Sequence, residues 1–491
     1  MKHPKKKHAV RTLGIIGGLG SLAGGDLFLK LLKSEPVLAD QGHYHLLFEQ
    51  HPFNDLSVPL ASDASMTSRK LYVFQVCQGF ADSGADAVLI PCFASHTFVE
   101  ELKAELPIPI IDMMAALRQH VARVAQPGTR LGILASDYVR ACGLFERHFA
   151  ADFELVYPSA ASQAALMQAV YGPAGIKAGH LEGVAVELLH QACLDLASQG
   201  ATLLLPGLTE LSLVVPGLQR RGVACIDANQ VYADYASASD SAGVDTRFKL
   251  GIVGGVGPAA TVDFMGKVVR NTPAGRDQDH IKMVVEQNPQ IPDRTANLLY
   301  QQTDPTLALY ATCKRLACEG ANAIAIPCNT AHAYVETLQA HVQVPIVNML
   351  SETIAFIKRT YGADRQVGLL ATSGTLQSHV YHRAAARAGL SLLVPDAAAQ
   401  ALVMRAIYGE QGVKAGHTQG QCKDDLLAAA AHLVEKGASV LILGCTELPL
   451  ILPQADDFQV GSARVALVDP TNVLAQRCVQ LALAQGSDYQ R

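Results

Sequence analysis

Two cysteines in the second half of the chain stand directly after apolar runs that predict β-strands. Cys328 follows the run at 323–326, within the sequence PCNTAH, and Cys445 follows the run at 440–443, within GCTEL. If a helix starts at each junction, its unpaired amides and partial positive charge would lower a thiol pKa and hold a carboxylate. One such cysteine is usually a small core residue, but two, each followed by hydroxyl or amide side chains, indicate chemistry. One thiolate can take a proton from carbon while the other thiol delivers one to the opposite face, which inverts a stereocentre.

Other uses of paired cysteines fit the sequence less well. His332 lies four residues after Cys328, but the ligand spacing of a structural zinc site is absent, so we expect no metal. A disulfide between the two cysteines is disfavoured in a reducing compartment. The glycine-rich turn at 254–258 lacks the third glycine of a dinucleotide fingerprint, so we expect no cofactor there. A tight turn that lets the backbone approach a small anionic ligand is the preferred interpretation.

Short aliphatic runs alternate with longer helical patterns around these cysteines. This alternation predicts βαβ units, hence an α/β fold with parallel sheets covered on both faces. Ligands of such sheets bind beyond the carboxyl ends of the strands, where both cysteines are expected. In the second half the predicted strands are 249–253, 282–286, 323–326, 344–347, 367–370, 390–394, 440–443 and 465–468.

The chain contains one internal duplication. Residues 13–26 match 250–263 at a shift of 237 with eight identities, and the matches of 81–92 to 317–328 and of 171–180 to 408–417 keep the same order. A period near half the chain indicates two tandem modules, which we place at 10–236 and 249–487, joined by a linker at 237–248 that is rich in Ser, Ala and Asp. Because one copy of the glycine-rich turn lies mid-chain, the start after Lys5, Lys6 and Lys7 is not expected to be a signal peptide.

Composition narrows the classes of partner. The 491 residues carry a net charge of −5 and no basic stripe, so a nucleic-acid partner is not expected. No run is long and apolar enough for a membrane span, and small molecules become the default ligands. Eleven cysteines without a CxxC pair, in a chain too long for a disulfide scaffold, favour the cytoplasm.

The motifs together resemble the cofactor-independent aspartate/glutamate racemases, within the wider Asp/Glu/hydantoin racemase superfamily. The resemblance rests on residues 251–258, 292–295, 327–332, 370–375, 408–416 and 443–449, in the family's order. It implies two Rossmann-like subdomains per module, with the active site in the cleft between them, and neither pyridoxal phosphate nor metal. It further implies that Cys328 and Cys445 are the catalytic acid/bases. By the same resemblance, the α-carboxylate and amino group would be held by Asn329, Thr330, Thr372 and Thr446, and a side-chain carboxylate by Arg294 and Lys414.

The first module departs from this pattern. Cys92 is present, but Phe93 and Ala94 replace the polar pair after Cys328, and Leu208 stands where Cys445 would be. The segment 51–57 has no arginine, and Ser57 aligns with Arg294, whereas Lys177 aligns with Lys414. Two-base inversion cannot run with one base, so we expect a degenerate copy that could still accept an anion.

The sequence therefore predicts a racemase of acidic amino acids, with aspartate favoured and glutamate next. Another activity of the superfamily (hydantoin racemase, decarboxylase or cis–trans isomerase) and a non-catalytic protein that binds acidic amino acids remain alternatives. His332, His417 and Glu447 could orient the site or be ordinary satisfied polar groups. The two modules are expected to form an internal pseudo-dimer.

Overall fold

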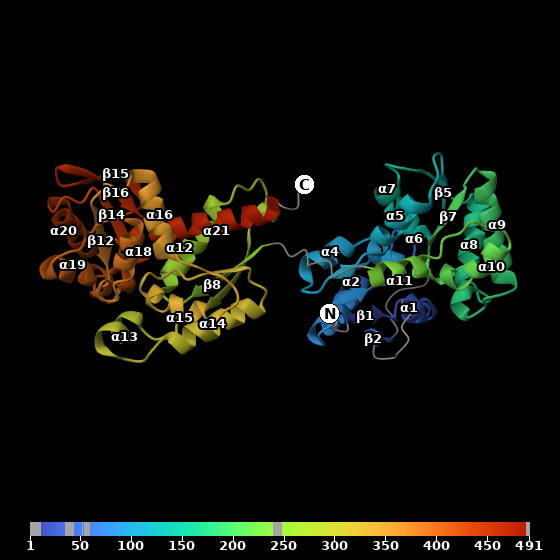
Figure 1. Cartoon of the computed structure of the whole chain (residues 1–491), viewed down its shortest axis with the longest axis horizontal. Helices are drawn as coiled ribbons and strands as arrows, with labels where there is room; N and C mark the ends of the chain where they lie inside the picture. Colours follow the sequence, from blue (N-terminus) through green and yellow to red (C-terminus); the bar gives the residue numbers. More distant parts are fainter. Residues whose placement is uncertain (1–10, 35–43, 52, 54–58, 239–247, 488–491) are drawn as a thin grey trace, which may run out of the picture. The chain divides into compact units, whose positions relative to one another are not determined.

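A computed structural model describes residues 11–34, 44–51, 53, 59–238 and 248–487 (Figure 1). The chain divides into two compact units, Met1–Thr246 (unit 1) and Arg247–Arg491 (unit 2). Most of the expected linker, residues 239–247, lies outside the described residues, as do residue 10 and residues 54–57. Residues 237 and 238, also assigned to the linker, are the last two of the helix α11 (Ala228–Ala238).

Unit 2 is built on two sheets. The first has the order β9-β8-β10-β11 and is entirely parallel. The second has the order β13-β12-β14-β16-β15 and is parallel except at its last pair. The strands are β8 (Lys249–Gly254), β9 (Lys282–Gln287), β10 (Ala323–Ala325), β11 (Ile346–Val347), β12 (Val367–Ala371), β13 (Leu392–Leu393), β14 (Val440–Gly444), β15 (Ala455–Val460) and β16 (Ala463–Val468).

Unit 1 has two parallel sheets, in the orders β2-β1-β3-β4 and β6-β5-β7. Its strands are β1 (Thr12–Ile16), β2 (His45–Glu49), β3 (Ala87–Leu89), β4 (Ile110–Ile111), β5 (Arg130–Ala135), β6 (Glu154–Val156) and β7 (Leu203–Gly207). The fold class is therefore α/β with two tandem halves, as the sequence predicts.

Every strand predicted in the second half is present, and one was missed. β15 pairs antiparallel with β16 in a hairpin at the edge of the second sheet. Its sequence, ADDFQV, is largely exposed and polar, so it lacks the aliphatic run by which buried parallel strands are recognised.

Helices cover both faces of each sheet in unit 2. Leu250 and Ile252 of β8 pack on one side against α12 (Pro258–Asn271) and α21 (Pro470–Ser487), whereas Val253 packs on the other side against α14 (Thr306–Cys318). In the second sheet, alternate residues of β12 and β14 face α16 (Met349–Tyr361) and α18 (Val380–Ala388) on one side, and α19 (Ala397–Tyr408) and α20 (Gln421–Glu435) on the other. Full burial of a side chain such as Leu250 stabilises the fold by about 1.5–3 kcal/mol.

The remaining helices connect these layers or flank the sites. In unit 2 they are α13 (Arg294–Tyr300), α15 (Val335–Gln339) and α17 (Ser373–Gln377). In unit 1 the helices before α11 are α1 (Ser21–Ser34), α2 (Thr67–Asp82), α3 (Phe93–His96), α4 (Val99–Glu105), α5 (Met113–Val124), α6 (Asp137–Ala141), α7 (Leu144–Phe149), α8 (Ala160–Tyr171), α9 (Val184–Ser198) and α10 (Val215–Arg220).

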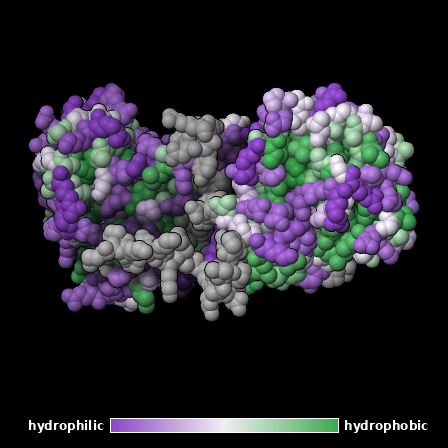
Figure 2. Space-filling view, turned by 45° about the vertical axis from the view of Figure 1, so that its right-hand side comes forward, coloured by the Kyte–Doolittle hydropathy of each residue, from purple (hydrophilic) through white to green (hydrophobic). Residues whose placement is uncertain are grey.

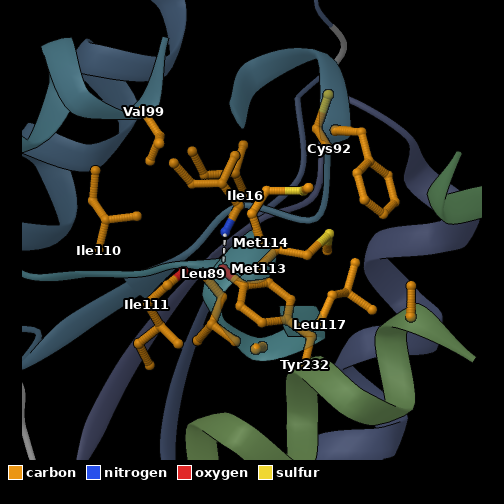
Figure 3. Packing of buried hydrophobic residues seen from close by; sticks show 14 of the residues in the cluster. Ile16, Leu89, Cys92, Val99, Ile110, Ile111, Met113, Met114, Leu117 and Tyr232 are labelled. Atoms are coloured by element: carbon orange, nitrogen blue, oxygen red, sulfur yellow. Dashed lines mark hydrogen bonds between the residues drawn. The ribbon is translucent and has the colours of Figure 1, made fainter. Parts of the chain in front are cut away.

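Each unit ends with a helix that returns to its first sheet. In unit 2 the chain leaves the first sheet through α16 and comes back through α21, where Asp469 pairs with Lys267 of α12 at 2.5 Å. In unit 1, α11 returns in the same way, and Asp227 pairs with Lys30 of α1 at 2.7 Å. Tyr232 of α11 reaches into the unit 1 core, where its hydroxyl accepts from the Ile90 amide and donates to the Ile111 carbonyl (Figure 3). The two subdomains of a unit are therefore joined at two places.

The surface of each unit contains both hydrophobic and hydrophilic residues. Figure 2 shows hydrophobic patches interrupted by hydrophilic residues on the visible faces of both units. Within the described residues, no helix is both long and apolar enough to cross a bilayer.

Candidate active site

Both sequence-predicted thiols stand at the carboxyl ends of central strands of unit 2. Cys445 follows β14 directly, and Cys328 lies three residues after the end of β10. The helices expected after them are only short 3₁₀ turns, Thr330–Ala333 and Leu448–Leu450. The expected lowering of the thiol pKa by a helix is wrong for Cys445, because burial and the charge of Glu447 raise its pKa well above the usual value.

Glu447 links Cys445 to Lys414. The Cys445 Sγ donates to Glu447 Oε2 at 3.0 Å, and the Lys414 Nζ donates to the other oxygen at 2.5 Å. Burial alone would raise the pKa of Glu447, but the ammonium of Lys414 outweighs it and holds that pKa below the usual value. The carboxylate is therefore ionised and the neighbouring thiol is protonated.

The glycine-rich turn explains how Glu447 fits. A Cβ on Gly257, which has φ +114°, would lie 2.6 Å from Glu447 Oε1. Only glycine allows the backbone to come this close with a positive φ. The anionic group that the turn approaches is the protein's own carboxylate, and the expected approach to an anionic ligand stays a prediction.

Arg294 and Asn329 present buried donors beside Cys328. The Arg294 guanidinium donates through Nη1 to the Pro292 carbonyl at 3.2 Å, whereas its Nε finds no acceptor among the described residues. Burial would lower the pKa of Arg294, but the Cys328 sulfur and the Asp293 carboxylate raise it. Asn329 accepts from the Tyr381 hydroxyl at 2.6 Å, and its Nδ2 is also buried without an acceptor in the described part of the chain. Two buried donors without acceptors are costly unless a ligand supplies oxygen atoms.

Hydroxyl groups from both subdomains meet beside these donors. Thr330, after the first sheet, lies 3.1 Å from Thr372 and 2.8 Å from Thr375, both after the second sheet, measured between the Oγ1 atoms. Thr295 of α13 donates to Thr372 at 3.4 Å. Thr446 donates to Glu447 Oε2 at 3.3 Å. Hydroxyls can switch between donating and accepting, so this cluster can re-pair around a bound ligand.

Of the two histidines considered in the sequence, His332 is buried beside Cys328, whereas His417 lies on the surface. The His332 Nδ1 lies 2.9 Å from the Cys328 carbonyl, and its Nε2 accepts from the Met349 amide at 3.0 Å, so the proton sits on Nδ1. Burial lowers the pKa of His332 to about 4, which keeps the ring neutral. Through these two hydrogen bonds, His332 links the Cys328 carbonyl to the Met349 amide at the start of α16. His417 is exposed and does not line the site.

All eight predicted site residues line one cavity. It contains Cys328, Cys445, Arg294, Asn329, Thr330, Thr372, Lys414 and Thr446, together with Val256, Thr295, Tyr408 and Glu447. Its volume is about 10 Å³, the space of a single water. The walls come from both subdomains, so the subdomains must move apart to admit an amino acid. Within the described residues, no group of His, Cys, Asp and Glu side chains is arranged to hold a metal ion.

Two residues of the cavity that were not assigned to the site could have been found from the motifs. Thr295 and Tyr408 lie inside the quoted motifs 292–295 and 408–416, from which only Arg294 and Lys414 were assigned to the site. Tyr381 could not be found by spacing, because it comes from α18 and reaches the site only through Asn329.

Unit 1 has a corresponding cavity of about 60 Å³. Cys92, Lys177 and Glu210 occupy the places of Cys328, Lys414 and Glu447, and Leu208 fills the place of Cys445, as the sequence predicts. The segment 51–57 supplies no arginine to this lining, but Arg69 of α2 does, which the sequence reasoning missed. The aligned position in unit 2 is Pro305, directly before α14, so alignment of the two copies gives no sign of Arg69.

Comparisons with known proteins agree with the duplicated architecture. The family model Asp/Glu/Hydantoin racemase matches residues 16–236 and again 253–478. A broad specificity amino-acid racemase, RacX, of Bacillus subtilis is 28% identical over 244 residues, which is 48% of this chain and 100% of the relative. A glutamate racemase of Shewanella baltica is 32% identical over 183 residues, 36% of this chain and 63% of the relative. The solved structure of Picrophilus torridus aspartate racemase is 27% identical with a TM-score of 0.41, and it covers 48% of this chain and 94% of its own.

The two family matches cover most of both units, and the two relatives found by sequence are named amino-acid racemase and glutamate racemase. The chain belongs to the Asp/Glu/hydantoin racemase family of amino-acid racemases, with one copy of the family's domain in each unit.

Proposed function

We propose that unit 2 racemises an acidic amino acid without a cofactor, with aspartate favoured and glutamate next. The observation that carries the proposal is that two thiols line one cavity with two buried donors that find no acceptor among the described residues, Arg294 Nε and Asn329 Nδ2. Carboxylate oxygens are the acceptors that such donors require.

The charges of the cavity support an acidic substrate. Arg294 and Lys414 contribute two positive charges and Glu447 one negative charge, so the charged lining carries +1. An acidic amino acid at neutral pH has two carboxylates and one ammonium, a net charge of −1. Burying that ligand against an opposite net charge avoids the large penalty of an uncompensated charge.

In the proposed reaction, one cysteine thiolate removes the Cα proton and forms an S–H bond. The electron pair left on Cα is delocalised into the α-carboxylate, whose developing charge the preorganised donors stabilise. The thiol of the other cysteine then donates its proton to the opposite face of Cα. The product is the other enantiomer, and the two sulfurs have exchanged protonation states. Glu447 keeps Cys445 protonated and so supports it as the proton donor when Cys328 acts as the base.

The test uses the purified full chain without added pyridoxal phosphate. We expect circular dichroism to show interconversion of D- and L-aspartate, with solvent deuterium incorporated at Cα. Cys328→Ser and Cys445→Ser should each abolish racemisation, since a serine hydroxyl is too weak an acid to exchange roles with a thiol near neutral pH. Cys318→Ser, which changes an exposed thiol on α14, is the matched control.

Single-thiol variants give a second readout that depends on a folded site. With a β-chloro substrate, one base suffices: the thiolate takes the Cα proton, the C–Cl bond breaks and chloride leaves. Each variant should process one enantiomer only. Full racemisation by Cys445→Ser, dependence on pyridoxal phosphate, or binding of aspartate without deuterium exchange would each overturn the proposed function.

We also propose that unit 1 supports unit 2 as the other half of an internal pseudo-dimer, in the cytoplasm. Each unit leaves apolar side chains exposed seven residues apart on equivalent helices, Leu22 and Leu29 on α1, and Val262 and Val269 on α12. Such stripes are typical of surfaces that pack against a partner. The chain 247–491 alone should then aggregate or lose activity, and a soluble, monomeric and fully active fragment would contradict the proposal.

A further inference from the structure

Unit 1 holds a buried arginine that the proposed racemase reaction does not use. Arg69 is 7% exposed and lines the cavity of unit 1. Its Nη1 donates to the Cys92 Sγ at 3.5 Å, and its guanidinium lies 5.4 Å from the centre of the Phe53 ring. Its Nε is buried and has no acceptor, and no carboxylate pairs with Arg69 among the described residues.

The second cation of this cavity is already compensated. Lys177 forms a salt bridge with Glu210, which is 5% exposed. Among the described residues, Arg69 is therefore the cation of the cavity lining that has no carboxylate partner, and a buried guanidinium without a counter-ion is costly. Its planar fork suits a carboxylate, which can accept two hydrogen bonds from it.

The rest of the cavity differs from the unit 2 site in polarity and size. Ala94 and Val139 stand where Thr330 and Thr375 belong to the hydroxyl cluster, Phe93 replaces Asn329, and Leu208 replaces Cys445. These changes replace two hydroxyls, one amide and one thiol with apolar side chains, whereas Ser136 and Thr209 keep hydroxyls at the places of Thr372 and Thr446. At about 60 Å³ the cavity has room for roughly four waters, compared with about one in unit 2.

We propose that unit 1 is a second ligand site, which binds a small monocarboxylate with an apolar body against Arg69, next to the Cys92 thiol. The carboxylate lies on the guanidinium, and the apolar part faces Phe93, Val139 and Leu208. Cys92 lies at the edge of the unit 1 core, beyond the strand ends and away from Tyr232 (Figure 3). The Lys177–Glu210 pair stays intact and closes one side of the cavity.

The thiol makes the site testable without interference from unit 2. Iodoacetate and iodoacetamide both transfer a carbon to sulfur with loss of iodide, but only iodoacetate carries a carboxylate. Peptide mass spectrometry follows Cys92 separately from Cys328 and Cys445, and exposed Cys318 reports the intrinsic reactivity ratio of the two reagents. We expect the iodoacetate-to-iodoacetamide rate ratio at Cys92 to exceed that at Cys318 by about tenfold or more, the effect of one hydrogen-bonded charge pair.

Two variants distinguish the effect of the Arg69 guanidinium on Cys92 from a general effect of positive charge on α2. Arg69→Met should reduce the Cys92 ratio to that of Cys318. Lys70→Met removes one positive charge from the next position of α2, where Lys70 pairs with Glu101 on the surface, and should leave the ratio unchanged. Equal ratios at Cys92 and Cys318 in the unaltered protein, or an equal loss in both variants, would overturn the proposal.

A competition experiment remains informative if Arg69→Met does not fold. In the unaltered protein, propionate should slow the reaction of Cys92 with iodoacetamide, whereas propionamide should not. Protection by aspartate but not by propionate would overturn the ligand class, and absence of protection by any carboxylate would overturn the site. Racemase activity of unit 2 is measured in parallel and is not expected to follow either result.

Discussion

Glu447 accepts a hydrogen bond from the Cys445 thiol at 3.0 Å while its other oxygen holds the Lys414 ammonium. The carboxylate favours the protonated thiol, whereas on the other side of the cavity the guanidinium of Arg294 faces Cys328. The two sulfurs of unit 2 therefore experience opposite charges before any substrate binds. The proposed mechanism requires that one thiol donates while the other accepts, and this asymmetry supports it.

Glu447→Gln should shift the pH dependence of racemisation. The variant loses the negative charge that raises the Cys445 pKa, while the Lys414 ammonium, which lowers it, remains. The thiol then deprotonates at lower pH, so the alkaline limb of the kcat/KM profile should move to lower pH. Glu410→Gln, a change at an exposed position after α19, should leave the profile unchanged. An alkaline limb that stays at the same pH or moves to higher pH would show that Glu447 does not control the pKa of Cys445.

Arg294→Gln should reduce the preference for acidic substrates. The variant removes the buried guanidinium that is available to a carboxylate. Loss of a hydrogen bond to a charged group corresponds to about 10- to 100-fold in kcat/KM. The fall should be larger for aspartate than for alanine, in a comparison of steady-state rates. Arg270→Gln changes an arginine that is 66% exposed and serves as the control. An equal fall for aspartate and alanine would remove Arg294 from substrate selection.

Gly374→Ala should hinder closure of the unit 2 cleft. An added Cβ at Gly374 of α17 would lie 2.9 Å from the Thr295 Cα of α13, in the other subdomain. Because the backbone atom cannot move aside cheaply, the closed state is destabilised, and we expect a lower kcat together with a higher KM for aspartate. Gly79→Ala in α2 meets no atom within 4 Å and should change neither value. Unaltered kinetics of Gly374→Ala would mean that catalysis does not need this closed form.

Cys92→Ala should leave racemisation of aspartate nearly unchanged. Leu208 occupies the place of the second thiol in unit 1, so that unit lacks one of the two bases. Cys328→Ala, the equivalent change in unit 2, should abolish the reaction in the same assay. Loss of activity in Cys92→Ala would overturn the assignment of catalysis to unit 2.

Acidification should destabilise unit 2 through His332. The usual histidine pKa of about 6.5 applies in the unfolded chain, whereas burial lowers the pKa of His332 to about 4 in the folded unit. Between these values the unfolded chain binds the proton more strongly, so the free energy of unfolding falls as pH falls from about 6.5 to 4, by at most about 3 kcal/mol. Labelling of the buried Cys313 thiol in urea measures this stability. His332→Gln should flatten the dependence, and His341→Gln, an exposed change, should not.

Much of unit 2 could be predicted because its pattern is local. Each buried parallel strand is a short aliphatic run, and the residues after the run must lie at the carboxyl edge, which brought Cys328, Thr372 and Cys445 into one site. β15 was missed because an exposed edge strand carries no such run. Arg69 was missed for another reason. Comparison of the two copies assumes that equivalent side chains stand at aligned positions, but the guanidinium of the unit 1 cavity comes from α2, whereas Arg294 of unit 2 comes from α13.

The final helix of unit 2 has a consequence for the order of folding during synthesis. The core between β8, α12 and α21 contains Leu250 and Phe264 from the start of the unit and Leu474 and Cys478 from its end. The sheet that leaves the ribosome first is therefore covered last, and its apolar face stays open until almost the whole unit has been made. A nascent chain that stalls before α21 would expose the first subdomain, although the missing residues follow the second.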